Sequence, residues 1–246
     1  MKTVLFVSFV LLLTTSSCAQ SGRRMDFESY NPVSTLKVEE HLVKRAKFPF
    51  IDIHNHQWNM SGKDLQSLIT DMDKLNMGVM NNLSGNSGDN LKNSVNNIKA
   101  NYPKRFTVFA NIDFDGIGTA GWTENAAKQL AVDVSNGVSG LKIFKNLGFS
   151  VRDNKGQRVP VDDPRLDAIW DKCGELKIPV LIHTADPKSF WDPMDANNER
   201  WLELESHPGR KRSDTDPEPF EQLIEEQHHM FRKHPKTTFI AAHFGW

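Results

Sequence analysis

The chain lacks the features that define several large classes of protein. Its 246 residues include only two cysteines, Cys18 and Cys173, which excludes a fold held together by disulfides. No run of 18 or more apolar residues occurs, so the sequence contains no membrane-spanning helix. Lys and Arg number 30 against 31 Asp and Glu, and no basic excess indicates binding to nucleic acid. The remaining composition, 38% hydrophobic and 25% charged, is typical of a folded globular protein.

The first twenty residues have the pattern of an export signal. Lys2 precedes an apolar run over residues 4–13, and small residues follow as far as Gln20. A positive start, a short apolar core and a small-residue exit are typical of a cleaved signal peptide. We expect the mature protein to begin at Gln20; alternatively, Cys18 carries the lipid anchor of a bacterial lipoprotein. The protein is therefore predicted to be exported, whether periplasmic, secreted or lipid-anchored.

A polar lead-in over residues 21–47 is followed by one domain over residues 48–246, in which short apolar segments alternate with amphipathic ones. The predicted strands are Phe48–His56, Gly78–Leu83, Phe106–Ile112, Gly140–Phe144, Pro179–Thr184 and Thr237–Phe244. The predicted helices are Asp64–Asn76 with Ser61 as its cap, Asp89–Asn101, Thr123–Asn136, Pro164–Lys177 with Asp163 as its cap, and Pro219–His234. This alternation predicts βαβ units and a parallel sheet, and hence an α/β fold.

Two parallel architectures fit this order, an open doubly wound sheet and a (β/α)₈ TIM-type barrel. The turn after the first strand lacks the glycine-rich loop that a dinucleotide-binding sheet uses to hold phosphate. Histidines stand at the strand ends instead: His54 and His56 on the first strand, His183 on the fifth and His243 on the sixth. Barrel enzymes carry their chemistry at the carboxyl ends of several strands, so the pattern favours the barrel.

The spacing of these histidines predicts a divalent metal site. Residues i and i+2 of a strand point to the same face, so His54 and His56 project together if Ile51 and Ile53 pack outward on the helices. Two neutral imidazoles this close chelate a divalent ion such as Zn²⁺, whereas two protonated ones repel each other. A lone histidine is usually structural, but a group at three strand ends favours a metal site. The other histidines are interpreted as solvated: His41, His207, His228, His229 and His234.

Three segments resemble the amidohydrolase superfamily, most closely its amidohydrolase-related (amidohydrolase 2) branch of metal-dependent hydrolases, lactonases and decarboxylases. They are Ile51-Asp-Ile-His54-Asn-His56, Leu181-Ile-His183-Thr-Ala-Asp186-Pro187 and Phe239-Ile-Ala-Ala-His243-Phe-Gly245. The resemblance implies a (β/α)₈ barrel in which His54, His56 and His183 bind the metal. It implies that His243 either binds a second ion or orients and deprotonates the water or substrate.

One departure from that family concerns an aspartate after strand eight, its last ligand or base. The chain ends at Trp246, directly after the sixth predicted strand, and six strands cannot close an eight-stranded barrel. We therefore expect a barrel that is C-terminally truncated after about six βα units, with the aspartate beyond Trp246. Asp52, Asp113 and Asp186 do not occupy that position. The chain as printed is expected to be inactive for this reason.

Two lysines, one within the fourth predicted strand and one directly after it, are further candidates. Lys142 and Lys145 have opposite parity, so at most one of them faces the barrel, and Lys145 lies nearer the catalytic end. The resemblance implies that one of them, either Lys145 or Lys142, is a carbamylated lysine that bridges two metals. The alternative function is an ammonium that binds a substrate carboxylate, and Lys145 is the favoured residue. The structural alternative is a buried ion pair between Lys142 and Asp52.

A long connection over Ala185–Glu218 follows the fifth predicted strand and holds Phe190, Trp191 and Trp201 among charges and prolines. Loops at the carboxyl ends of barrel strands shape substrate pockets, so we expect this segment, with Trp191, to form a pocket wall. Trp58 shares the parity of the first histidine pair and is predicted to line the same pocket. The alternative is a rigid surface flap packed by its own aromatic side chains.

The predicted activity is hydrolysis of an amide, ester or lactone bond of a small molecule by a water that a divalent metal activates. Zn²⁺ is the expected ion, and either one or two ions fit. Two alternatives remain open: a non-oxidative decarboxylase of the same fold, and a non-catalytic exported binding protein. The sequence leaves the substrate and the oligomeric state open, a homo-oligomer being one option.

Overall fold

The computed structural model describes residues 33, 35–39, 41–195 and 197–245. The predicted export signal, Cys18 and the predicted mature start at Gln20 lie outside the described residues. The chain divides into two units, residues 1–42 and 43–246, and the described residues of the first adopt no helix or strand. The second unit carries the predicted α/β domain. Within the described part of the chain, no helix is both long and apolar enough to cross a bilayer.

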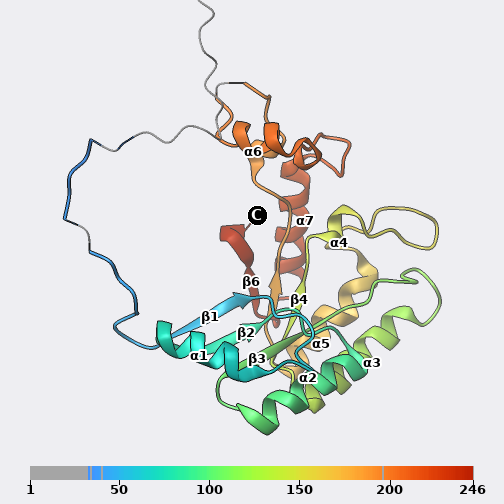
Figure 1. The fold of residues 1–246 in the computed structure, drawn as a ribbon. Coiled ribbons are helices and arrows are strands. Elements are labelled where there is room, and N and C mark those ends of the chain that lie inside the picture. The colour runs from blue at the N-terminus through green and yellow to red at the C-terminus, as the bar shows by residue number, and fades with distance from the viewer. Residues whose placement is uncertain (1–32, 34, 40, 196, 246) are drawn as a thin grey trace, which may run out of the picture. The chain divides into compact units, whose positions relative to one another are not determined.

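Six parallel strands form one curled sheet in the order of the sequence (Figure 1). They are β1 (Phe50–Asn55), β2 (Met77–Asn82), β3 (Phe106–Asn111), β4 (Gly140–Ile143), β5 (Val180–Ile182) and β6 (Phe239–Ala241). Each strand pairs with the next in parallel register. The sheet is thus an open half-barrel with β1 and β6 as its edges, and it confirms the predicted succession of about six βα units.

Helices follow the strands as the alternation predicts. They are α1 (Leu65–Leu75), α2 (Gly88–Asn101), α3 (Trp122–Asn136), α5 (Asp167–Leu176) and α7 (Phe220–Lys233). Figure 1 shows α2, α3 and α5 side by side, and α3 contacts both neighbours. Their apolar faces bury the central strands in one core that includes Leu141, Val180 and Trp170. Burial of such side chains is the main stabilising contribution to the domain.

The caps of two helices differ in detail from the predicted ones. Asp64, not Ser61, caps α1, because its side chain accepts a hydrogen bond from the Gln66 backbone N–H at 2.9 Å. Asp163 accepts from the Arg165 backbone N–H as predicted, but the turn it caps is a 3₁₀ helix over Pro164–Leu166 that leads into α5. Cys173 on α5 is fully buried.

The outer face of β1 is not covered as the sequence suggests. Ile51 and Ile53 were expected to pack on helices, yet they are 61% and 55% exposed. The physical reason is that β1 is an edge strand, and α1 packs against β2 instead. Alternation along the strand still sets these two isoleucines on the face opposite to that of His54.

The sixth strand is shorter than predicted, and short helices interrupt the long connections. β6 ends at Ala241, and a 3₁₀ turn over Ala242–Gly245 follows, in which His243 and Phe244 have φ of 53° and 63°. A strand cannot continue through residues with positive φ, so His243 lies in a turn and not on the strand.

The other short helices are α4 (Asn146–Phe149), α6 (Trp201–Ser206) and 3₁₀ turns over Lys188–Phe190 and Pro208–Arg210.

Candidate metal centre

Four histidines gather at the carboxyl edge of the half-barrel. His54 lies in β1, His56 is the first residue after it, His183 directly follows β5, and His243 lies two residues beyond β6. The ring centres of His54 and His56 are 5.4 Å apart, those of His54 and His243 5.0 Å, and those of His183 and His243 4.5 Å. The curl of the sheet therefore brings residues of its two edge strands together, although these strands are not neighbours in the strand order.

The electrostatics of this cluster favour neutral imidazoles. Burial, together with the nearby His243 and Lys142, lowers the pKa of His183 to about 3. Burial and the charge of Lys142 lower the pKa of His54 to about 4, and the same two causes lower the pKa of His56 and of His243. At neutral pH all four rings are uncharged, and each has a nitrogen lone pair of the kind that divalent metals bind.

Lys142 of β4 is the cation that acts on all four histidines. Its side chain is almost fully buried, and its Nζ forms no hydrogen bond with any residue that the structure describes. Burial lowers the pKa of this lysine to about 8, and its ammonium lies 5.4 Å from the centre of the Phe144 ring. The predicted ion pair with Asp52 is not formed, because the Asp52 carboxylate instead accepts hydrogen bonds from the His54 backbone and the Asn55 amide.

Lys145 is placed differently. It lies beyond the end of β4, and its Nζ contacts the Asp186 carboxylate at 2.6 Å. Arg212, which sequence reasoning missed, contacts the other oxygen of the same carboxylate at 2.9 Å. The charge of Lys145 also contributes to lowering the pKa of His183. Lys145 is thus a paired neighbour of the cluster, whereas Lys142 is its buried cation; a substrate-binding or catalytic role for Lys145 stays a prediction.

The two predicted substrate-binding tryptophans have different surroundings. Trp58 is 63% exposed and stacks with His56 at 6.3 Å and with Phe144 at 6.4 Å between ring centres. Trp191, in the segment after β5, packs edge-on against Phe149 of α4 and Phe220 of α7, and its indole N–H donates to the Glu218 carbonyl at 2.9 Å. Trp58 therefore offers an open aromatic surface beside the histidines, while the polar atom of Trp191 is used within its own segment.

Two further residues that sequence reasoning missed support His56. The Ser84 hydroxyl lies 2.8 Å from His56 Nδ1. Asn82, at the end of β2, accepts hydrogen bonds from the backbone N–H groups of Gln57 and Ser84. The signal was present in the sequence, since the polar residues Asn81, Asn82 and Ser84 stand at the end of the second predicted strand.

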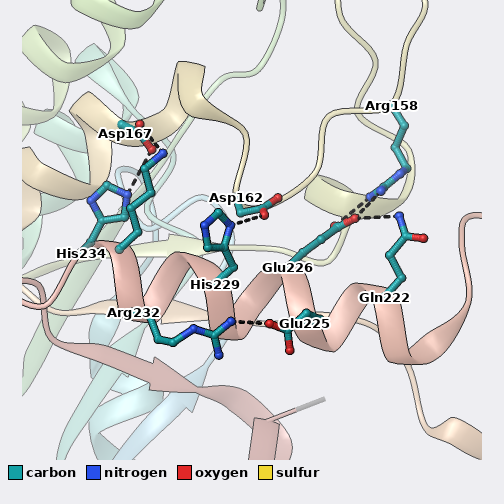
Figure 2. A network of polar contacts seen from close by, with 10 residues as sticks. Arg158, Asp162, Asp167, Gln222, Glu225, Glu226, His229, Arg232 and His234 are labelled. Carbon is teal, nitrogen blue, oxygen red and sulfur yellow. Dashed lines mark hydrogen bonds and ion pairs between the residues drawn. The ribbon is translucent and has the colours of Figure 1, made fainter.

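The other five histidines do not belong to this cluster. Four of them are exposed as predicted, and His234 is not. His41, His207, His228 and His229 are exposed as expected. His234 is buried, because the carboxylates of Asp171 and Asp167 hold its two ring nitrogens at 2.8 and 3.1 Å. Figure 2 shows His234 with Asp167, and His229 with Asp162, along α7. These two carboxylates, which lie far away in the sequence, compensate the loss of hydration when the His234 ring is buried.

The donor chemistry of the cluster fits a divalent metal, but the present orientation of the described rings does not yet bring three donors to one point. Two imidazoles on one tetrahedral zinc ion have ring centres about 5 Å apart, which is close to the spacing of each neighbouring pair here. Within the described residues, however, no three His, Cys, Asp or Glu side chains converge on one point as a bound ion requires. At least one imidazole must rotate before three of them can share an ion.

Comparison with known proteins agrees with this picture. A family model for amidohydrolases matches residues 51–246, which is most of the chain. The chain belongs to the amidohydrolase family. Comparison of this chain with curated proteins finds no match.

Among solved structures, this chain is similar to 2,6-dihydroxybenzoate decarboxylase from Rhizobium, with a TM-score of 0.52 and 17% identity over 82% of this chain and 67% of that chain. It is also similar to a 2,6-dihydroxybenzoate decarboxylase complexed with 2,6-dihydroxybenzoate, with a TM-score of 0.50 and 18% identity over 82% of this chain and 68% of that chain. At such identities the likeness shows the shared fold alone.

Proposed function

We propose that this protein is an exported, metal-dependent hydrolase that cleaves an amide, ester or lactone bond of a small molecule. The observation that carries the proposal is the cluster of four neutral imidazoles at the carboxyl ends of β1, β5 and β6, in a chain of the amidohydrolase family. Export rests on the pattern of the first twenty residues. Intact mass of protein from the native host would give a start at Gln20 or a lipidated Cys18, and recovery of Met1 would contradict export.

His54, His56 and His183 would hold the ion, for which we propose Zn²⁺ at one or two sites. When bound, such an ion polarises a carbonyl group and lowers the pKa of a water toward neutrality. His243, neutral and exposed next to His54 and His183, would accept a proton from the attacking group and return it to the leaving group. Lys142 in its protonated form would stabilise negative charge that develops on the substrate oxygen.

A second candidate, non-oxidative decarboxylation of an aromatic acid, is favoured by the surroundings of the histidines. Lys142 and Lys145 both place positive charge near His183, and a substrate carboxylate would be attracted to it. The exposed face of Trp58, stacked with Phe144, suits a planar ring. The solved decarboxylases that share the fold make this reaction the natural alternative to test.

The deciding experiment is an activity assay of the full-length protein loaded with Zn²⁺ or Mn²⁺ and compared with the chelator-treated protein. Hydrolysis of lactones, esters or amides that is lost on chelation and restored by metal is expected. Metal-dependent CO₂ release from hydroxybenzoates, without hydrolysis, would replace the hydrolase proposal by the decarboxylase. A metal-loaded protein that performs neither reaction would contradict both enzymes and favour a binding protein.

A further inference from the structure

Ser84 lies two residues beyond β2, and its side chain contacts His56 of the candidate metal centre. Its side chain is 6% exposed, and its Oγ lies 2.8 Å from His56 Nδ1. We propose that Ser84 is a positioning residue: by accepting a hydrogen bond from His56 Nδ1–H, it leaves the Nε2 lone pair of His56 as the one directed at the metal. This inference rests on the proposed metal function of His56.

The position of the Ser84 hydroxyl is itself determined by a buried amide. Asn82 is 1% exposed, and its Oδ1 accepts from the Ser84 backbone N–H at 3.0 Å and from the Gln57 backbone N–H at 2.8 Å. Its Nδ2 donates to the Gln57 carbonyl at 3.0 Å. One side chain therefore ties the residue after His56 to Ser84, so that hydroxyl and imidazole face each other before any ligand binds. Such pre-organisation reduces the entropy lost on binding.

The chemical consequence concerns the tautomer of His56. A neutral imidazole carries one proton, and the nitrogen that carries it cannot donate a lone pair to a metal. If the Ser84 oxygen accepts the Nδ1 proton, Nε2 is free and the ring orientation is fixed. Hydrogen bonds of this kind to a ligating histidine typically contribute 10–100-fold in metal affinity. The hydrogen bond also limits rotation of His56, so the rings that must turn to share an ion are those of the other histidines.

The test compares two serines of equal burial. Ser84 and Ser94 are both 6% exposed, but the Ser94 hydroxyl donates to the Asn90 carbonyl within its own helix, α2. Zinc affinity is measured by competition with a chromophoric chelator for the wild type, Ser84→Ala, Ser84→Thr and Ser94→Ala. Ser84→Ala should bind zinc about 10–100-fold more weakly, while Ser94→Ala binds as the wild type does. Ser84→Thr, which keeps the oxygen, should restore most of the affinity.

The tautomer gives an independent measurement in the metal-free protein. The ring ¹⁵N shifts of His56, assigned with His56→Ala, should show a proton on Nδ1 in the wild type and a shift toward the Nε2–H form in Ser84→Ala. Unchanged zinc affinity in a folded Ser84→Ala, or an Nε2–H tautomer in the wild type, would overturn the role of Ser84. A wild type that binds no zinc but keeps the Nδ1–H tautomer would instead contradict the proposed metal function.

Discussion

Ionisable side chains are buried in two regions of the molecule, and the regions differ in how the charges are compensated. Beside α7, buried polar groups have partners within the fold. Arg158 binds Glu226 through both ends of its guanidinium, and Asp167 contacts His234 (Figure 2). Asp171 contacts the other ring nitrogen of His234. At the carboxyl edge of the sheet, Lys142 has no hydrogen-bond partner among the described residues, and His54 and His183 have strongly lowered pKa values.

The difference separates groups whose charges are paired within the fold from groups that we propose bind a ligand. A buried charge is tolerated when a partner compensates its desolvation, as beside α7. At the sheet edge the histidines lose their protons and become neutral donors, whereas Lys142 remains a buried cation at neutral pH. Residues with strongly shifted pKa values that gather in one place are typical of functional sites. Substitutions in the two regions should therefore have different consequences.

The largest change in stability is expected for Arg158→Met. The Arg158 side chain is 13% exposed, and its removal leaves the buried Glu226 carboxylate without its cation. Breaking a buried pair in this way destabilises a protein by about 3–5 kcal/mol, which urea unfolding would measure. The matched control is Arg232→Met on the same helix, whose pair with Glu225 is largely exposed and whose loss should leave the unfolding curve unchanged. Equal effects of the two variants would contradict the contrast.

A somewhat smaller change, of opposite sign, is expected for Lys142→Met in the metal-free protein. The folded-state pKa of about 8 lies below the ordinary 10.5, so the protonated lysine opposes folding at neutral pH. Removing it should stabilise the protein by up to about 3 kcal/mol at pH 7. Between pH 8 and 10.5 the unfolded chain binds more protons than the folded one, so the wild type should gain stability with rising pH and approach the variant. If the free energy of unfolding changed with pH in the same way for both proteins, Lys142 would not be a buried lysine without a compensating partner.

The smallest effect on stability is expected for Trp58→Ala. Trp58 is exposed, and its loss should change the free energy of unfolding by no more than about 0.5 kcal/mol. Trp191→Ala is the comparison, because it removes a ring packed on Phe149 and Phe220 and should cost about 2 kcal/mol. If Trp58 lines the substrate pocket, KM for the accepted substrate should be higher in the Trp58→Ala variant than in the wild type. A Trp58→Ala protein with unaltered kinetics would remove it from the pocket.

Much of the fold could be predicted because its signals are local. The alternation of apolar strands and amphipathic helices is present in short windows of sequence, and it predicts all six strands. The grouping of His54, His183 and His243 could also be predicted, since the carboxyl ends of parallel strands share one edge of a sheet. At this edge several strands end earlier than predicted, and the last strand differs most, because a turn with positive φ has no apolar pattern to reveal it.

The rest could not be predicted because it depends on contacts between distant residues. His234 is buried by Asp167 and Asp171, which lie more than sixty residues earlier in the chain. Arg212 finds Asp186 only because the segment after β5 folds back on itself. The choice between Lys142 and Lys145 as the buried cation needed the true end of β4, and sequence boundaries of strands are uncertain by a few residues.

The measurement that tests the central claim most directly is the zinc content of the dialysed protein, determined by elemental analysis. The wild type should retain one or two equivalents, and His54→Ala/His56→Ala should lose them, with affinity weakened by more than the 10–100-fold typical of an outer hydrogen bond. His228→Ala/His229→Ala changes the same number of imidazoles on the exposed face of α7 and should leave the zinc content unaltered. Equal zinc in both double variants would contradict the assignment of the histidine cluster as the metal centre.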